Sequence, residues 1–191
     1  MAPIEGRIEF TKKYAVKEAL RGLEGFSRIW LIWGFSQNKP AKGEWQPTVR
    51  PPRLGGNAAM GVFATRSPYR PNPLGLSCVE LVGMDGTNLI VKGADLADGT
   101  PIFDIKPYIP YADSFPDAAA GFANEAPEKK LEVIIPEGIG LNPVQTAALK
   151  EVLSLDPRPA YHPEKEYALP FEGHDVRFTV EGNTLTVSAW D

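Results

Sequence analysis

Short apolar segments separated by turn residues occupy residues 1–118 of the chain. Ile29–Phe35 is a continuous apolar run, which is typical of a fully buried strand. A turn signal at 84–88 separates two later segments, and residues 20–26 are predicted to form one helical turn. We expect strands at 7–10, 29–35, 60–64, 76–82, 88–93 and 102–108. Short strands at this near-regular spacing predict a mainly β fold, either a β-barrel or a strongly bent sheet.

The last third of the chain has a different pattern. Asn142-Pro143 is typical of a helix N-cap and first turn, and apolar spacing extends the predicted helix to about Leu153. A strand is predicted at 131–135, and a hairpin turns at 181–183. Between 115 and 127 Ala, Gly, Asn and Pro accumulate, which is typical of a domain boundary. We therefore expect a β domain over 1–118 and a small α+β domain over 126–191.

Composition and motifs exclude several classes of function. The chain has 191 residues, 43% of them hydrophobic, and no apolar run reaches the length of a membrane span. The first residues lack the pattern of a secretory leader and Cys78 is the single cysteine, so we expect a cytoplasmic protein without a leader or an internal disulfide. His162 and His174 lack metal-ligand spacing, so we expect no metal site. Neither a Walker loop nor a dinucleotide fingerprint is present.

The net charge of -4 is unevenly distributed. Residues 1–118 carry 14 basic and 12 acidic side chains, whereas residues 119–191 carry 6 basic and 12 acidic side chains. Between 37 and 70, six lysines and arginines are opposed by Glu44 alone. Such a local excess predicts a basic patch that binds a phosphate backbone, unless the six side chains scatter over different faces.

The segment Gly61–Ser77 combines two arginines with three prolines. Because each proline fixes φ and removes a backbone donor, the segment is predicted to be stiff. Arg66 and Arg70 on such a loop would form a preorganised clamp for an anion or a planar group. The alternative is a proline-braced connection with solvated arginines, and the residues alone leave both interpretations open.

A second polar segment runs from Asp95 to Tyr108. Its carboxylates at 95 and 98 fit a tight turn, and an Asx-type turn is the favoured interpretation for Asp95. Asp104 and Lys106 share one strand face, with Phe103 and Ile105 expected on the other. The pair is either a solvent-facing ion pair of little energetic value or, with Tyr108, the polar wall of a site.

Three segments in this order resemble the TsaA-like, or TrmO, family of S-adenosylmethionine-dependent tRNA methyltransferases. They are 50–57, 65–75 and 95–108, and the segment 156–161 resembles the C-terminal signature of that family. The resemblance implies a small single-sheet β-barrel followed by the α+β domain, and a homodimer. It also implies methylation of N6 of threonylcarbamoyladenosine at position 37, beside the anticodon of threonine tRNA.

The resemblance and the local chemistry together assign roles to residues. S-adenosylmethionine would be held by Ser36, where relatives often have histidine, and by Gln37, Arg66, Leu76, Asp95, Leu96, Ala97, Asp98 and Gly99. The tRNA anticodon loop would meet Arg50, Arg53, Tyr69, Arg70, Asn72 and Lys106. The arginines would meet phosphates or the threonyl carboxylate, while Trp45 and Tyr69 would stack on bases. The candidates for accepting the N6 proton are, in order, Asp98, Asp104 and Tyr108.

One departure from the family pattern leaves alternatives open. Relatives usually begin with a strand and a proline-rich loop before the segment that corresponds to Gly6–Phe10, and both are absent here. The cofactor site is therefore expected to be either truncated or completed by a partner subunit. Two other functions remain possible on the sequence: an RNA-binding β-barrel that has lost its cofactor, and a methyltransferase that acts on another acceptor.

Overall fold

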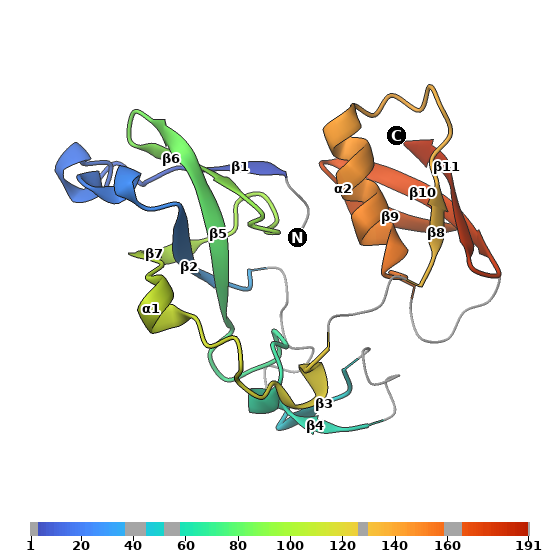
Figure 1. The fold of residues 1–191 in the computed structure, drawn as a ribbon, viewed down its shortest axis with the longest axis horizontal. Coiled ribbons are helices and arrows are strands. Elements are labelled where there is room, and N and C mark those ends of the chain that lie inside the picture. Colours follow the sequence, from blue (N-terminus) through green and yellow to red (C-terminus); the bar gives the residue numbers. More distant parts are fainter. Residues whose placement is uncertain (1–3, 37–44, 52–57, 126–129, 159–165, 191) are drawn as a thin grey trace. The chain divides into compact units, whose positions relative to one another are not determined.

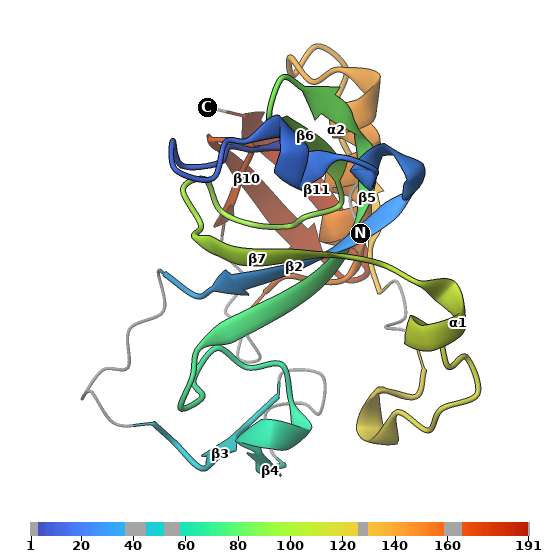
Figure 2. The same ribbon diagram turned by 90° about the vertical axis from the view of Figure 1, so that its left-hand side faces the viewer.

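An antiparallel sheet of five strands forms the centre of residues 5–119, which are unit 2 of the protein (Figures 1 and 2). The structure is a computed structural model, and it describes residues 4–36, 45–51, 58–125, 130–158 and 166–190. The elements of this unit are β1 (Glu5–Ile8), η1 (Lys17–Leu20), η2 (Leu23–Gly25), β2 (Arg28–Gly34), β3 (Thr48–Val49), β4 (Met60–Gly61), η4 (Val62–Ala64), β5 (Leu74–Asp85), β6 (Asn88–Lys92), β7 (Ile102–Pro107) and α1 (Pro110–Asp113).

The strand order β1-β6-β5-β2-β7 places the long strand β5 and the buried strand β2 in the middle of the sheet. Ile29 and Leu31 of β2 are fully buried on the inner face, where they pack with Val79, Leu89 and Val91. The strands expected from the apolar runs at 29–35 and 76–82 are therefore present as β2 and β5. Both strands bury apolar side chains in the core, as the sequence pattern predicted. The mainly β class is confirmed.

The sheet does not close into the single-sheet β-barrel that we expected. Among the described residues β1 pairs only with β6, and β7 pairs only with β2, so these two strands form opposite edges of an open sheet. A barrel requires hydrogen bonds between its first and last strands. The alternative expectation from the pattern, a bent sheet, fits better, because register shifts interrupt both the β5–β6 and the β2–β7 pairing.

The predicted strand at 60–64 is wrong beyond its first two residues. The strand β4 ends at Gly61, and the chain then turns through the 3-10 helix η4. The hydroxyl of Thr65 donates to the carbonyl of Val62 at 2.8 Å, which stabilises this turn. As a result Val62 is buried, whereas the side chain of Phe63 is 71% exposed. The single helical turn expected at 20–26 is likewise replaced, by the two 3-10 helices η1 and η2.

The side-chain alternation expected along β7 is also corrected. Ile102 and Ile105, three positions apart, both pack against the core, while Phe103 is 63% exposed. A register shift in the pairing with β2, between Ile32 and Trp33, accounts for this spacing. A bulge of this kind moves later side chains to the opposite face.

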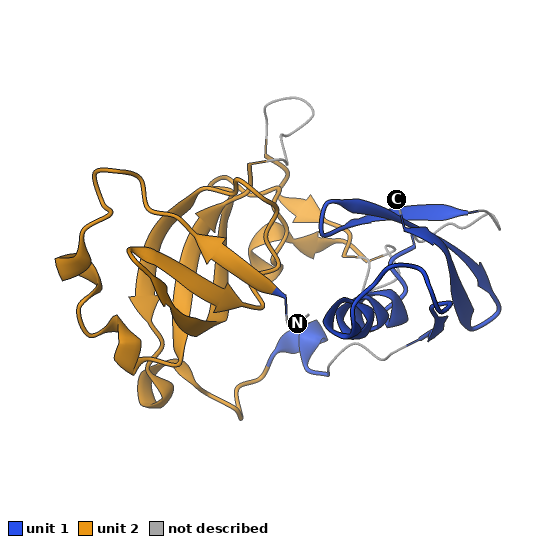
Figure 3. Cartoon of the chain, turned by 90° about the horizontal axis from the view of Figure 1, so that it is seen from above, with its two compact units in different colours: residues 1–4, 120–191 blue, residues 5–119 orange. Residues whose placement is uncertain are grey.

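Unit 1 comprises residues 1–4 and 120–191 (Figure 3). Its elements are η5 (Gly121–Ala123), β8 (Glu132–Ile134), α2 (Pro143–Ser154), β9 (Tyr167–Phe171), β10 (His174–Glu181) and β11 (Thr184–Trp190). The sheet order is β8-β11-β10-β9, and helix α2 contributes Leu149 and Leu153 to the core. Asn142 and Gln145 form a reciprocal capping box at the start of α2, which confirms the predicted helix. The sequence pattern did not predict β9.

The family-like segment 156–161 begins at an ion pair. Both Nε and Nη2 of Arg158 donate to the carboxylate of Asp156, at 2.7 and 2.9 Å, and this pairing raises the pKa of Arg158 above its ordinary value. Residues 159–161 lie outside the described residues. No helix in the described part of the chain is long and apolar enough to cross a membrane.

Candidate functional site

Three loops meet at one end of the five-stranded sheet, where β2 ends and β5 and β7 begin. The backbone N–H of Gly34 donates to the carbonyl of Pro101 at 3.0 Å, and that of Phe35 donates to the carbonyl of Pro73 at 2.9 Å. These two bonds join the end of β2 to the turn that precedes β7 and to the proline-rich loop that precedes β5. Ser36, exposed directly after this junction, therefore lies beside both predicted segments.

Aromatic packing fixes this end of the sheet from the inner face. The indole N–H of Trp33 donates to the hydroxyl of Ser77 at 3.0 Å, and the rings of Trp33 and Phe35 lie 4.4 Å apart. The indole covers Gly75 so closely that a Cβ there would lie 2.2 Å from it. On the neighbouring strand a Cβ at Gly34 would lie 2.9 Å from the ring of Phe103. Gly75 is needed because the half-buried indole of Trp33 occupies the space of its side chain, whereas the exposed ring of Phe103 could move away from a side chain at residue 34.

The loop 65–73 is stiffened by its own side chains as well as by its prolines. Nη1 of Arg70 donates to the carbonyl of Thr65 at 2.9 Å and to that of Ser67 at 3.4 Å. The hydroxyls of Thr65 and Ser67 accept the backbone N–H groups of Ser67 and Tyr69, both at 3.2 Å. Half-buried Arg70 is thus an internal brace of the loop. Arg66 is exposed and has no hydrogen bond or ion pair with the described residues.

The turn 95–101 presents its two carboxylates to solvent. Thr100 closes the turn, because its backbone N–H and hydroxyl both donate to the carbonyl of Ala97, at 3.2 and 2.7 Å. Gly99 has φ +71, which this tight turn requires, and Asp95 has φ +49. Neither Asp95 nor Asp98 makes a side-chain hydrogen bond to a described residue, so the Asx-type turn expected at Asp95 is not formed. Leu96 is half-buried against the core, and Ala97 is exposed.

Leu76 and Asp104 lie in one row across the outer face of the sheet. Ile32 of β2 pairs with Leu76 of β5 on one side and with Asp104 of β7 on the other. Leu76 is 57% exposed, so this row is open to solvent. The next row of the same face joins Trp30 to Lys106.

The Asp104–Lys106 pair has the geometry of the surface ion pair that the sequence left open. Nζ of Lys106 lies 3.0 Å from Oδ2 of Asp104, and the backbone N–H of Ile105 donates to Oδ1 at 2.9 Å. The ammonium group and this N–H hold the pKa of the Asp104 carboxyl below its ordinary value. A lowered pKa makes a carboxylate a weaker proton acceptor.

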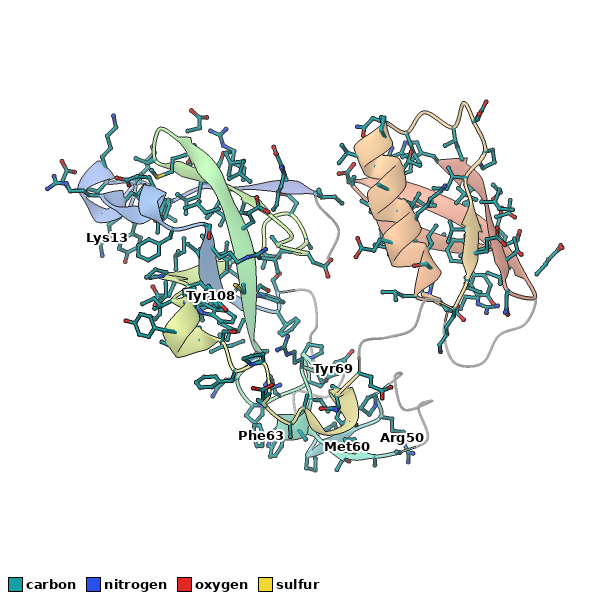
Figure 4. The ribbon with its side chains drawn as sticks, viewed as in Figure 1. Lys13, Arg50, Met60, Phe63, Tyr69 and Tyr108 are labelled. Carbon is teal, nitrogen blue, oxygen red and sulfur yellow. The ribbon has the colours of Figure 1, made fainter. Side chains whose placement is uncertain are left out.

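Tyr108 lies apart from the three loops. Its ring packs on Trp30 at 5.8 Å, beside α1, where the indole N–H donates to Asp113 at 3.0 Å. Figure 4 shows Tyr108 next to β2 and β7, whereas Arg50, Phe63 and Tyr69 gather around β3 and β4. The structure therefore does not bring Tyr108 together with the predicted substrate-binding residues of the loops.

The predicted substrate-binding residues are mostly exposed. Arg50 follows β3, and Tyr69 and Asn72 follow η4 in the braced loop. Gln37 and Arg53 lie outside the described residues.

Sequence reasoning missed Phe63, an exposed ring 6.1 Å from that of Trp45, because its apolar neighbours suggested a strand. Thr65, two residues later, was the available signal, since threonine often hydrogen-bonds to the backbone of a tight turn.

Two surface hollows lie elsewhere. One is lined by Lys17, Leu20, Arg21 and Met84, and the other by Val133, Lys150 and Ser154 of unit 1. Neither contains a predicted site residue. Among the described residues no group of three or more His, Cys, Asp and Glu side chains could hold a metal ion.

Comparison with known proteins finds the same family in both units of the chain. Residues 1–114 match the family model of the tRNA-methyltransferase O N-terminal domain, and residues 128–190 match that of the TrmO C-terminal domain. The tRNA (adenine(37)-N6)-methyltransferase of Escherichia coli K12 is 44% identical over 191 residues, which cover 92% of this chain and 80% of that protein. The enzyme of the same name from Eikenella corrodens is 45% identical and covers 86% of this chain, with 96% of its own length aligned.

Solved structures give the same answer. A crystal structure of TrmO superposes with a TM-score of 0.78 at 33% identity, over 99% of this chain and 85% of the other. Further relatives have names that refer to S-adenosylmethionine dependence or binding. Both family models match, and together they span most of the residues of both units. The chain therefore belongs to the TrmO family.

Proposed function

We propose that the protein methylates N6 of the adenine at position 37 of tRNA, with S-adenosylmethionine as the methyl donor. The observation that carries this proposal is the convergence of three loops at one end of the sheet, fixed by the Gly34–Pro101 and Phe35–Pro73 hydrogen bonds. All three loops lie within residues 1–114, which match the N-terminal family domain. We propose residues 1–118 as the methyltransferase domain and residues 126–191 as the C-terminal domain.

The exposed groups at this junction fit the parts of S-adenosylmethionine. A guanidinium without a partner among the described residues, at Arg66, suits its carboxylate. The exposed carboxylates of Asp95 and Asp98 suit an ammonium group or ribose hydroxyls. Among the described residues no heavy atom lies within 4 Å of the Cβ position at Gly99, so a ligand could approach the backbone of the turn there. Leu76 offers an apolar contact on the adjoining outer face. When bound, the donor supplies an activated methyl group, and its sulfur takes up the electron pair of the broken S–C bond.

The protein must position adenine N6 and accept a proton. N6 gives the electron pair of the new N–C bond and loses its proton to an acceptor. In threonylcarbamoyladenosine, which we propose as the substrate, the attached carbonyl withdraws electrons from N6 and acidifies this proton. Asp98 is the best placed acceptor, because Asp104 is held by Lys106 and has a lowered pKa. Tyr108 is the least favoured acceptor, because it packs on Trp30.

Arg50 is the proposed contact for the threonyl carboxylate or an anticodon-loop phosphate, with Tyr69 and Asn72 beside it in the substrate path. Arg50 and Tyr69 are exposed around β3 and β4 (Figure 4). Bidentate guanidinium donors match both carboxylate and phosphate groups. Gln37 and Arg53 keep the roles that the family resemblance implies.

We further propose a cytoplasmic homodimer that uses the outer face of the sheet. Leu74 and Leu76 on β5 are 49% and 57% exposed, beside Ile32 of β2. A second subunit on this face would shield these side chains and complete the cofactor site. Leu74→Glu should sediment as a monomer, and calorimetry should show that its affinity for S-adenosylmethionine is reduced. Ile134→Glu, at a residue 47% exposed in the other unit, should leave both properties unchanged. Monomeric wild-type protein would contradict the dimer.

The activity is tested with S-adenosylmethionine labelled on its methyl group. The purified full chain is incubated with threonine tRNA that carries threonylcarbamoyladenosine, and with the same tRNA lacking that modification. We expect label in the anticodon loop of the modified tRNA only. Transfer to both tRNAs would show that the enzyme accepts adenine 37 without the threonylcarbamoyl group. Calorimetry that detects cofactor binding, without label transfer to either tRNA, would overturn the proposed reaction. Tight tRNA binding without cofactor binding would support the RNA-binding alternative.

A further inference from the structure

Two exposed aromatic rings lie together outside both hydrophobic cores. Phe63 is 71% exposed and Trp45 is 46% exposed, and their centroids are 6.1 Å apart with 33° between the ring planes. The folding of η4 exposes Phe63, because that turn buries Val62 instead. A large apolar ring exposed by a well-defined turn indicates a binding surface rather than a core that failed to close.

Arg70 fixes the position of Phe63. Its guanidinium carbon lies 5.8 Å from the centroid of the phenyl ring, and its Nη1 donates to the carbonyl of Thr65, two residues after Phe63. The ring of Phe63 therefore contacts both a braced cation, at 5.8 Å, and a second aromatic ring, at 6.1 Å. Such preorganisation lowers the entropic cost of binding a flat ligand.

The charge around these rings selects the class of ligand. The described residues 45–51 and 58–73 contain three arginines, Arg50, Arg66 and Arg70, and no aspartate or glutamate. Phosphate groups are favoured next to such a surface, and unpaired bases stack on aromatic rings and on guanidinium planes. Aromatic rings and arginines are also enriched at protein interfaces, so the test below measures oligomeric state beside RNA affinity.

We propose that Trp45 and Phe63 form a stacking platform for an unpaired base of RNA, held in position by Arg70. The inference rests on the proposed function, because the RNA is taken to be the anticodon loop of the substrate tRNA. It changes the role of Arg70 from a phosphate contact to a brace of the platform. It also adds Phe63 to the residues that contribute to RNA affinity.

The test uses the full-length protein and a fluorescent anticodon stem-loop RNA. Phe63→Ala should weaken RNA binding about tenfold or more, since each base–aromatic stack contributes strongly to affinity. Phe63→Trp should retain binding, and calorimetric affinity for S-adenosylmethionine should be unchanged in both variants. Tyr14→Ala, at a ring 60% exposed on the segment before η1, is the matched control and should bind RNA normally. Figure 4 shows the neighbouring Lys13 far from Phe63.

Stem-loops with a single abasic nucleotide identify the stacked base. One abasic position should weaken binding to the wild-type protein yet have little further effect on Phe63→Ala, because both changes remove the same contact. Equal RNA affinity of Phe63→Ala and wild type would overturn the platform. A changed oligomeric state with normal RNA affinity would instead mark the rings as a protein interface and would also overturn it. Failure of wild-type protein to methylate tRNA, with the Phe63 effect on RNA binding intact, would contradict only the proposed function.

Discussion

The indole of Trp33 covers Gly75 on the neighbouring strand, and a Cβ at residue 75 would lie 2.2 Å from that ring. The two residues are register partners in the β2–β5 ladder. The contact is therefore a direct result of strand pairing at the end of the sheet where the three loops meet. Through the hydrogen bond of Trp33 to Ser77, it also fixes the start of β5 after the arginine-containing loop.

Gly75→Ala is expected to destabilise the protein by about 1–3 kcal/mol, because the indole must move and its hydrogen bond to Ser77 is strained. The same displacement should weaken S-adenosylmethionine binding. Urea unfolding followed by tryptophan fluorescence and calorimetry measure the two effects. Gly83→Ala, on the same strand with no heavy atom within 4 Å of the added Cβ, is the matched control. Equal stability of both variants would contradict the packing argument.

Arg66→Ala should weaken S-adenosylmethionine binding by roughly tenfold or more, because a charged hydrogen bond to the cofactor carboxylate is lost. Affinity for tRNA should fall less. Stability should remain unchanged, since Arg66 is exposed and makes no ion pair with the described residues. Calorimetry with the cofactor and fluorescence anisotropy with tRNA measure the two affinities separately. Equal losses in both would argue against a cofactor role.

The strands around the core followed from the sequence because burial imposes a visible pattern. Ile29 and Leu31 are fully buried in the apolar run that predicted β2. The helix at 143–154 followed from its Asn142 cap for a similar local reason. Closure of the sheet could not be derived in this way. It depends on whether two distant edges pair, and the prediction of a barrel was wrong for that reason.

The candidate site was harder to predict than the fold. The prolines predicted that the loop of Arg66 and Arg70 is stiff, but they left open whether its arginines bind a ligand or are solvated. The different environments of the two arginines depend on which guanidinium reaches the carbonyl of Thr65, and no sequence period encodes that reach. Phe63 was missed because three apolar residues in a row fit a strand and a 3-10 turn equally well.

Asp98→Asn should reduce kcat by about a hundredfold or more if Asp98 accepts the N6 proton, because the amide cannot take up a proton. Asp104→Asn should reduce kcat by less than about threefold, since it removes only a surface ion pair with Lys106. Single-turnover methylation of the modified tRNA at saturating cofactor separates the chemical step from binding. A larger effect at Asp104 than at Asp98 would reverse the assignment.

Asp113 gives a prediction of pH dependence. Its carboxylate accepts hydrogen bonds from Ile109 N–H at 2.8 Å and Trp30 Nε1 at 3.0 Å, and these bonds hold its pKa below the ordinary value of 3.8. On acidification the unfolded chain therefore takes up this proton first. The stabilisation that these two hydrogen bonds give is complete above pH 3.8, and it is lost as the pH falls through the lower pKa of Asp113 in the folded protein.

Asp113→Asn should therefore be less stable than wild type at neutral pH, and the difference should shrink as the pH falls below 3.8. Urea unfolding at pH values from about 6 to about 2, followed by tryptophan fluorescence, measures the difference. Asp117→Asn, at an exposed carboxyl four positions later, is the control and should track the wild type throughout. A stability difference for Asp113→Asn that stays constant over this range would show that the two hydrogen bonds do not favour the ionised carboxylate.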